Sequence, residues 1–169
     1  MFDFKYIGIN VINHVKGLDP ECDCMEFGEI RYGTHKSDKP LVHKITNLTD
    51  RPLFAIDAEV IKSPPITNPL PLVAEKHKLV KTRDRCRCYK LTLKPGESVC
   101  VSYPFFYLRV VLTGGTIKTE LSTGGGNSIG LSWEQEYVIG DLKWMEPCMN
   151  MKQTNIGNTT YDVYLAEWR

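Results

Sequence analysis

The feature that most restricts the fold of this chain is a series of short strand-like segments with turn sequences between them. Pro95-Gly96 and Gly114-Gly115 are two of these turn sequences. No long segment has the 3.6-residue periodicity of an amphipathic helix, and the best helix candidate is short, at residues 74–80. The pattern therefore predicts an all-β sandwich or barrel. The predicted strands are residues 4–12, 53–61, 86–93, 98–103, 106–112, 116–121, 136–139 and 159–167.

Composition excludes several classes of function. The 169 residues suit one domain, and 42% hydrophobic with 24% charged residues predicts a globular chain. Lys and Arg total 21 against 20 acidic residues, so there is no global charge for binding nucleic acid. No apolar run reaches the roughly 18 to 20 residues that a membrane span needs. The first ten residues lack the pattern of a secretory signal, so we expect a cytoplasmic protein.

Six cysteines lie at positions 22, 24, 86, 88, 100 and 148. In a cytoplasmic protein we expect free thiols rather than disulfides. Two C-x-C pairs, at 22–24 and 86–88, could each offer two thiolates to a metal if they lie on strands. We prefer the interpretation that these cysteines are small apolar residues buried in strands.

A proline-rich stretch divides the chain. Residues 63–71 contain four prolines, which lack the donor that a sheet ladder needs. We therefore predict an N-terminal part at residues 1–62, a connection at 63–80 and a main unit at 81–169. Basic residues at the odd positions from Lys81 to Arg87 would form a stripe on one strand face. We interpret it as a solvated outer face, with an anion site as the alternative.

An internal repeat relates residues 43–60 to residues 151–168 at a constant offset of 108. Upstream, Gly28–Tyr32 is similar to Gly140–Trp144. Each copy has the order of a Gly-acidic turn, a strand, an Asn-centred turn and a final strand. The identical pairs are Lys44 and Lys152, Thr46 and Thr154, Asn47 and Asn155, Ala58 and Ala166, and Glu59 and Glu167.

This order of pieces resembles the cupin superfamily, in particular its small RmlC-like barrels. Residues 85–98 resemble the first cupin strand with its Pro-Gly turn, residues 106–121 the following hairpin, and residues 140–168 the second cupin motif and closing strand. Residues 28–61 resemble part of a second, incomplete unit. The resemblance implies an all-β double-stranded β-helix, or jelly roll, with extra N-terminal strands and a ligand site in the barrel.

The metal-binding residues of cupins are not found in this sequence. The family pattern of two His and a Glu, counted from Gly96, falls on Ser102, Pro104 and Leu108 or Arg109, and the second-motif His falls on Met151. We therefore expect no metal and no other cofactor. A weaker alternative keeps a metal through His43, Cys86 or Cys88.

The resemblance places a candidate site inside the barrel. We expect proton transfer by Tyr103, Arg109 and Lys152, with Asp57, Glu59, Glu120 and Glu134 as further acids or bases. We expect the substrate to contact an apolar lining of Phe105, Tyr107, Trp144 and Met151.

The sequence leads to two hypotheses about function. The first is a metal-independent isomerase or cyclase that acts on an apolar small metabolite. The second is a non-catalytic barrel that binds a ligand or scaffolds a partner protein. Neither hypothesis involves nucleic acid or a membrane. Because an incomplete first unit would leave sheet edges uncovered, a homodimer is also expected.

Overall fold

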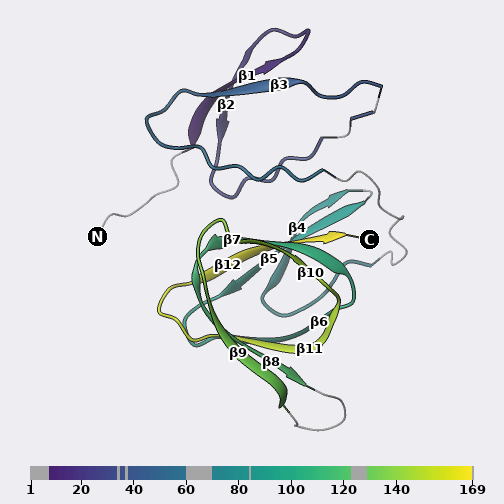
Figure 1. The fold of residues 1–169 in the computed structure, drawn as a ribbon, viewed down its shortest axis with the longest axis vertical. Coiled ribbons are helices and arrows are strands. Elements are labelled where there is room, and N and C mark those ends of the chain that lie inside the picture. The colour runs from purple at the N-terminus through teal and green to yellow at the C-terminus, as the bar shows by residue number, and fades with distance from the viewer. Residues whose placement is uncertain are drawn as a thin grey trace. The chain divides into compact units, whose positions relative to one another are not determined.

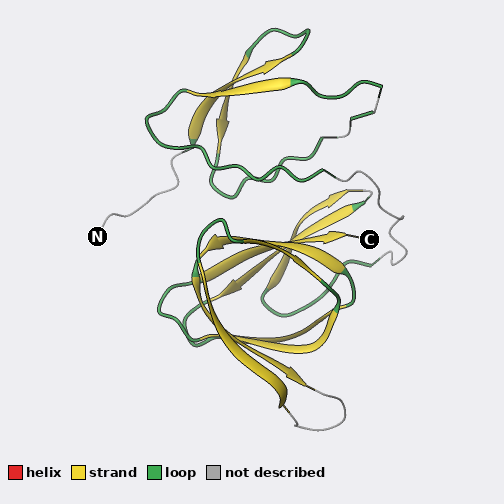
Figure 2. Cartoon of the chain, in the orientation of Figure 1, coloured by secondary structure: helices red, strands yellow, loops and turns green. Residues whose placement is uncertain are grey.

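The computed structural model describes residues 8–33, 35–36, 38–59, 70–83, 85–122 and 129–168. It divides into two compact units, Met1–Glu59 and Val60–Arg169. The described parts of both units consist of strands, turns and loops, without a helix (Figure 2). Each unit is considered by itself below.

The N-terminal unit contains one antiparallel sheet of three strands. Its strands are β1 (Ile9–Val15), β2 (Glu21–Met25) and β3 (His43–Asn47), in the spatial order β2-β1-β3. The central strand β1 pairs with both neighbours, and its Val11 is 1% exposed. These strands therefore form a sheet of their own and add none to the sheets of the C-terminal unit.

The C-terminal unit contains two antiparallel sheets that face each other (Figure 1). One sheet has the order β10-β7-β12-β5-β4, and the other has the order β6-β11-β8-β9. The strands are β4 (His77–Arg83), β5 (Cys86–Leu93), β6 (Ser98–Tyr103), β7 (Phe106–Thr113), β8 (Gly115–Ser122), β9 (Ile129–Tyr137), β10 (Leu142–Met145), β11 (Cys148–Asn155) and β12 (Tyr161–Trp168).

The strand order is that of a jelly roll. From β5 to β12 the chain passes back and forth between the two sheets, and only the β8–β9 hairpin stays within one of them. The inner strands of each sheet are thus β7, β12 and β5 on one side, and β11 and β8 on the other. This is the double-stranded β-helix that the cupin resemblance implied, and strand β4 extends one of its edges.

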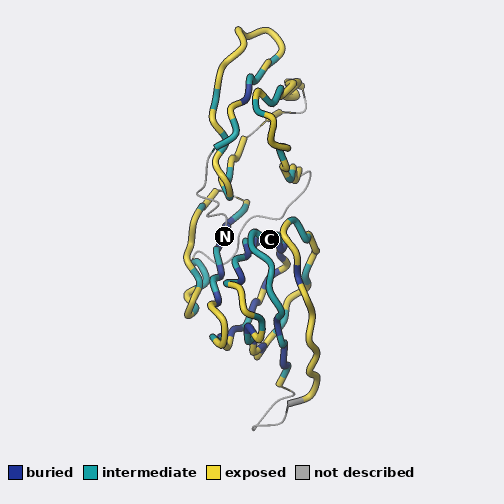
Figure 3. Tube along the Cα trace, turned by 90° about the vertical axis from the view of Figure 1, so that its left-hand side faces the viewer, coloured by how far each residue is buried: buried dark blue, intermediate teal, exposed yellow. Residues whose placement is uncertain are grey.

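The core lies between these two sheets. Along β12 the residues alternate between buried and half-buried, as expected for a strand with one face inside the barrel (Figure 3). Tyr161, Val163 and Leu165 supply its apolar core residues, and β5 supplies Tyr89, Leu91 and Leu93. The alternation of each strand therefore decides which side chains reach the interior.

Two predicted elements are wrong. Residues 74–80 do not form a helix, because β4 begins at His77 and pairs with β5. Residues 53–59 do not form a strand, since no other strand pairs with them. Residues 4–7, 60 and 61 lie outside the described residues. The strands predicted at 86–93 and 98–103 are confirmed as β5 and β6.

The repeat is visible as two turns with the same hydrogen bonds. Asn47 Oδ1 accepts from Thr49 N at 2.9 Å, and its Nδ2 donates to Arg51 O at 2.6 Å. Asn155 Oδ1 accepts from Gly157 N at 3.0 Å, and its Nδ2 donates to Thr159 O at 2.7 Å. The similarity does not extend to the flanking segments, since residues 28–32 and 53–59 form no strand whereas β10 and β12 do.

Candidate functional site

Four of the predicted site residues meet inside the barrel. Tyr103, Phe105, Tyr107 and Met151 are all at most 4% exposed and belong to one core cluster. The Tyr103 ring centroid lies 4.8 Å from that of Tyr107 and 6.1 Å from that of Phe105. Tyr103 ends β6, Phe105 lies in the short connection, and Tyr107 follows on β7, so this connection places all three rings together.

Tyr103 is hydrogen-bonded to a histidine of the neighbouring sheet. The distance from Tyr103 Oη to His77 Nε2 is 2.6 Å, and the two rings meet edge to face. Residue His77 lies opposite Leu91 in the β4–β5 pairing, and cross-strand partners share a face. Because Leu91 belongs to the core, His77 also points into the barrel.

The other ring nitrogen of His77 fixes the direction of this hydrogen bond. Nδ1 lies 2.7 Å from the carbonyl oxygen of Glu75, which can only accept, so Nδ1 carries a proton. Burial lowers the pKa of His77 below its ordinary value of 6.5, which favours the neutral ring at pH 7. In that neutral ring Nε2 is an acceptor, and Tyr103 donates its phenolic proton to it. Burial also raises the pKa of Tyr103 well above its ordinary value of 10.0.

His77 was not among the predicted site residues. The histidine falls in the stretch interpreted as a helix and lies before residue 81, where the main unit was expected to begin. A usable signal was present, since His77 and Leu79 alternate with lysine and valine as strand residues do.

Arg109 carries a buried positive charge inside the same barrel. It is 7% exposed and lies on the inward face of β7. Its Nη1 donates to Tyr137 Oη at 3.0 Å, and its guanidinium carbon lies 4.3 Å from the centre of the Tyr137 ring. Tyr137 in turn donates to Gln135 Oε1 at 3.0 Å. Among the described residues, no carboxylate lies within 4.0 Å of Arg109 to form an ion pair.

Two buried polar atoms near this charge have no hydrogen-bond partner among the described residues. They are Arg109 Nε and Tyr161 Oη, and Tyr161 is 0% exposed. Burial raises the pKa of Tyr161, while the charge of Arg109 acts in the opposite direction, so the two groups are close enough to interact. Both unpartnered groups are hydrogen-bond donors at neutral pH.

A second polar network fills another part of the barrel. Glu167 is fully buried, and its Oε2 accepts a hydrogen bond from Tyr89 Oη at 2.6 Å. Its Oε1 lies 3.7 Å from Nη1 of Arg87, and Leu72 N donates to the Tyr89 hydroxyl. Burial, with the hydrogen bond to Glu167, raises the pKa of Tyr89 to about 12.

This network corrects our interpretation of the basic stripe. Arg87 is 6% exposed and does not lie on a solvated outer face. The stripe is divided, because Lys81 and Arg83 belong to β4 whereas Arg87 belongs to β5, and a turn separates the strands. Within β5, Arg87 shares the inward parity of Tyr89 and Leu91, so burial of the charge requires the carboxylate of Glu167.

The structure places two predicted site residues outside the barrel. Lys152 lies opposite Glu120, and its Nζ is 3.7 Å from Glu120 Oε2 on the outer face. Trp144 is 49% exposed and lies opposite Leu108, on the face of β7 that points away from Tyr107. Its ring packs between Phe106 and Trp168. Lys152 cannot face the same interior as Met151, its neighbour on β11. Trp144 shares the outward face of its cross-strand partner Leu108.

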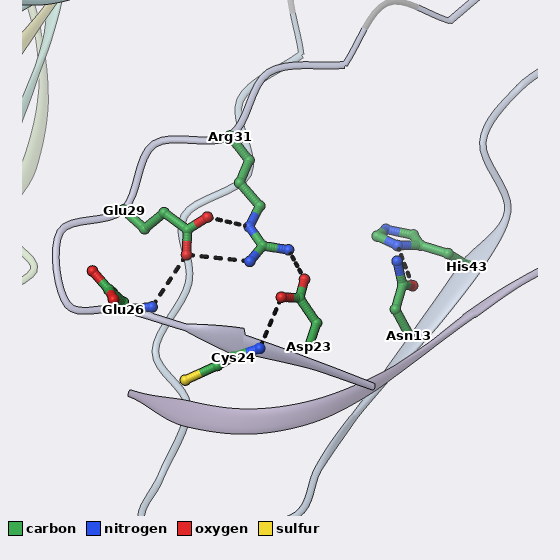
Figure 4. A network of polar contacts seen from close by, with 7 residues as sticks. All are labelled: Asn13, Asp23, Cys24, Glu26, Glu29, Arg31 and His43. Carbon is green, nitrogen blue, oxygen red and sulfur yellow. Dashed lines mark hydrogen bonds and ion pairs between the residues drawn. The ribbon is translucent and has the colours of Figure 1, made fainter. Parts of the chain in front are cut away.

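The described residues contain no group of three or more His, Cys, Asp or Glu side chains arranged to hold a metal ion. His43 of the N-terminal unit contacts Asn13, with 3.3 Å between Nδ1 and Oδ1 (Figure 4). Burial raises the pKa of Cys86 to about 11 and that of Cys88 to about 12, so both side chains are protonated thiols at neutral pH. The weaker alternative of a metal site therefore gains no support from the part of the chain that the structure describes.

The polar network of the N-terminal unit is exposed and joins one arginine to two carboxylates. Arg31 forms ion pairs with Asp23 and Glu29, and its Nε lies 2.7 Å from Glu29 Oε1 (Figure 4). Hydrogen bonds from Arg31 lower the pKa of both carboxyl groups. The remaining carboxylate oxygens accept from the backbone of Cys24 and Glu26. Because one guanidinium holds both carboxylates, we interpret this exposed network as a support for the loop.

Comparisons with known proteins found similar solved structures at low sequence identity. No protein-family model and no curated protein sequence matches the chain. A cupin domain from Bordetella pertussis is 15% identical and covers 55% of this chain and 91% of its own, with a TM-score of 0.47. An RmlC-like cupin from Methanocaldococcus jannaschii is 10% identical, covers 65% and 93%, and has a TM-score of 0.42.

A third solved structure, a cupin superfamily protein from Desulfitobacterium hafniense, is 16% identical and covers 63% of this chain and 95% of its own, with a TM-score of 0.39. All three TM-scores lie below 0.5, so the fold assignment rests on the strand order of the barrel itself. Among the described residues, no helix has the length and apolar character that a bilayer crossing requires.

Proposed function

We propose that the C-terminal unit, which has the cupin double-stranded β-helix fold, is a metal-independent barrel that binds a small molecule and moves protons on it. The chemistry would be of the isomerase or cyclase type. The observation that carries this proposal is the hydrogen bond from Tyr103 to His77, since it joins a phenol to a neutral imidazole inside the barrel.

The pair supports proton transfer in both directions. Tyr103 Oη takes a proton from a carbon of the substrate while its own proton passes to His77 Nε2, and an imidazolium ion forms. The reverse steps return one proton to a different atom of the substrate, so the net reaction is an isomerisation without an external acid or oxidant. Because the phenol gives up its proton as it gains one, a free phenolate never forms, despite the raised pKa of Tyr103.

The Glu75 carbonyl is part of this arrangement. It accepts the Nδ1 proton of His77 and so holds the ring in the tautomer whose Nε2 is free to accept. It would also stabilise the transient imidazolium, because both ring nitrogens then donate. Glu75 acts through its backbone, and the side chain at this position is not required.

One observation favours the alternative of a non-catalytic barrel that binds a ligand or scaffolds a partner. The rings of Tyr103, Phe105 and Tyr107 contact one another and occupy part of the interior themselves. Small barrels are commonly filled by their own side chains. The two functions therefore differ in whether a proton leaves a bound molecule, and this difference can be measured.

The test is deuterium incorporation from heavy water. Pools of small metabolites are incubated in heavy water with the wild-type protein, with Tyr103→Phe and with His77→Gln, and are analysed by mass spectrometry. The proposal predicts at least one compound that gains deuterium or isomerises with wild type only. Trp144→Ala is the control, and it should retain the activity because Trp144 lies on the outer face. Activity in Tyr103→Phe equal to wild type would exclude the pair.

A further inference from the structure

We infer that Arg109 is the binding group for the carboxylate of a small organic acid held inside the barrel. The inference rests on the proposed function in one respect, namely that the interior admits a small molecule, and it adds the chemical class of that molecule. It does not depend on whether Tyr103 and His77 move protons.

The two buried arginines of the barrel differ in whether a carboxylate lies beside them. Arg87 is 6% exposed and Arg109 is 7% exposed. For Arg87 the fold supplies a fully buried carboxylate, that of Glu167. For Arg109 none of the described residues supplies one within 4.0 Å. A guanidinium keeps its charge at any physiological pH, and a buried charge without a counter-ion is strongly unfavourable.

Hydrogen-bond donors near Arg109 lack acceptors in the described part of the chain. Nη1 of Arg109 donates to the Tyr137 hydroxyl, and the guanidinium lies over the Tyr137 ring. Nε of Arg109 has no acceptor among the described residues. The buried hydroxyl of Tyr161 likewise has no partner there. The site thus offers donors and a positive charge, which an anion with several acceptor oxygens would match.

The side chains around Arg109 indicate the chemical character of the rest of the ligand. The groups around Arg109 are the rings of Tyr137 and Tyr161, 5.5 Å apart between centroids, with Tyr107 close enough for its pKa to respond to the charge of Arg109. Such surroundings favour an apolar skeleton next to the charged group. The ligand class is therefore a carboxylic acid with an aromatic or branched aliphatic body, and not a sugar or a nucleotide.

The experiment compares carboxylates with their neutral amides. Wild-type protein is titrated with benzoate and 3-methylbutanoate, and with benzamide and 3-methylbutanamide, at pH 7.5, and binding is followed by calorimetry and thermal unfolding. We expect at least one acid to bind and its amide to bind at least tenfold more weakly. Failure of both acids to bind would overturn the inference.

Variants show whether Arg109 is responsible. Arg109→Met should remove the preference for the acid over the amide and raise the Tm of the unliganded protein, because an unpaired charge is replaced by an apolar group of similar length. Arg109→Lys keeps the charge without the fork of donors, and should lose at least tenfold in acid affinity. It serves as the second variant if Arg109→Met does not fold. Unchanged acid affinity in the variant that folds would overturn the inference.

The same titrations separate this inference from the proposed function. Trp144→Ala should bind the acid as wild type does, because Trp144 lies on the outer face of the barrel. If the acid binds through Arg109 while no proton exchange is detected, the inference holds and the catalytic proposal fails. If acid and amide bind equally and Arg109→Lys has no effect, the inference fails while the barrel remains a ligand-binding protein.

Discussion

Asn47 and Asn155 stabilise two turns, 108 residues apart, with the same pair of side-chain hydrogen bonds. In each, Oδ1 accepts from the amide two residues later and Nδ2 donates to the carbonyl four residues later. Only Asn155 is fully buried, and its Nδ2 also donates to Leu93 O at 2.9 Å. We therefore expect the same turn to contribute more to the free energy of unfolding in the C-terminal unit than in the N-terminal unit.

Asn155→Ala should lower the free energy of unfolding of the C-terminal unit by about 2–3 kcal/mol, because three backbone groups, one of them in a buried and two in part-buried hydrogen bonds, lose their partner. All three tryptophans, at 133, 144 and 168, lie in this unit, so tryptophan fluorescence during urea unfolding reports on it. Asn47→Ala is the matched control and should change that transition by less than about 0.5 kcal/mol. Equal effects of the two variants would contradict the separation into two units.

Glu167→Ala should be more damaging. Removing this carboxylate leaves Arg87 buried without its counter-ion and Tyr89 without its acceptor, with an expected cost of about 3–5 kcal/mol. The repeat provides the control, because Glu59 occupies the equivalent position in an exposed segment. Glu59→Ala should leave the urea transition unchanged. A Glu167→Ala protein as stable as wild type would show that the buried pair contributes little.

Stability should fall as the pH is lowered through about 6.5. The pKa of His77 is depressed in the folded state, so below its ordinary value the unfolded chain binds a proton that the folded protein does not. The slope of unfolding free energy against pH is then positive between the folded and unfolded pKa values. Urea midpoints measured between pH 5 and 7.5 should show this slope in wild type and a smaller one in His77→Gln. Equal slopes would mean that His77 titrates normally.

The cysteines should differ in their reaction with a thiol reagent. Cys88 is buried and its pKa is raised to about 12, whereas Cys100 is exposed. Because the thiolate is the reacting species, we expect Cys100 to be modified at least tenfold faster at pH 7.5. Peptide mass spectrometry after timed labelling identifies each site, and labelling in urea provides the fully reactive reference. Equal rates in the folded protein would contradict the burial of β5.

The sequence predicted the barrel well where strands alternate clearly between apolar and other residues. Segment 98–103 does so, as does segment 86–93 from Tyr89 onward, and they form β6 and β5. Strand β11 was missed because two of its inward residues are the buried polar Gln153 and Asn155. β10, with only four residues, was not among the strands predicted from alternation, although the repeat predicted a strand after the Gly-acidic turn at Gly140. Residues 53–59 have the alternation of a strand but no neighbouring strand to pair with, which a local pattern does not reveal.

The candidate site was predicted in part for the same reason. Tyr103, Tyr107 and Arg109 were chosen correctly as inward residues, since they share the odd parity of their strands. Lys152 and Trp144 follow the opposite parity and lie outside. The partner of Tyr103 could not be foreseen, because the contact with His77 depends on the pairing of β4 with β5, and that segment was interpreted as a helix.

The central claim is that a neutral His77 accepts the proton of Tyr103 inside the barrel. Its most direct test is a pH titration of imidazole ¹⁵N shifts in wild type and Tyr103→Phe. We predict that His77 has a protonated Nδ1 and an unprotonated Nε2 at pH 7, that it titrates below 6.5, and that its Nε2 shift changes when the phenol is removed. A His77 imidazolium at pH 7, or an Nε2 chemical shift that is the same in wild type and Tyr103→Phe, would contradict the claim.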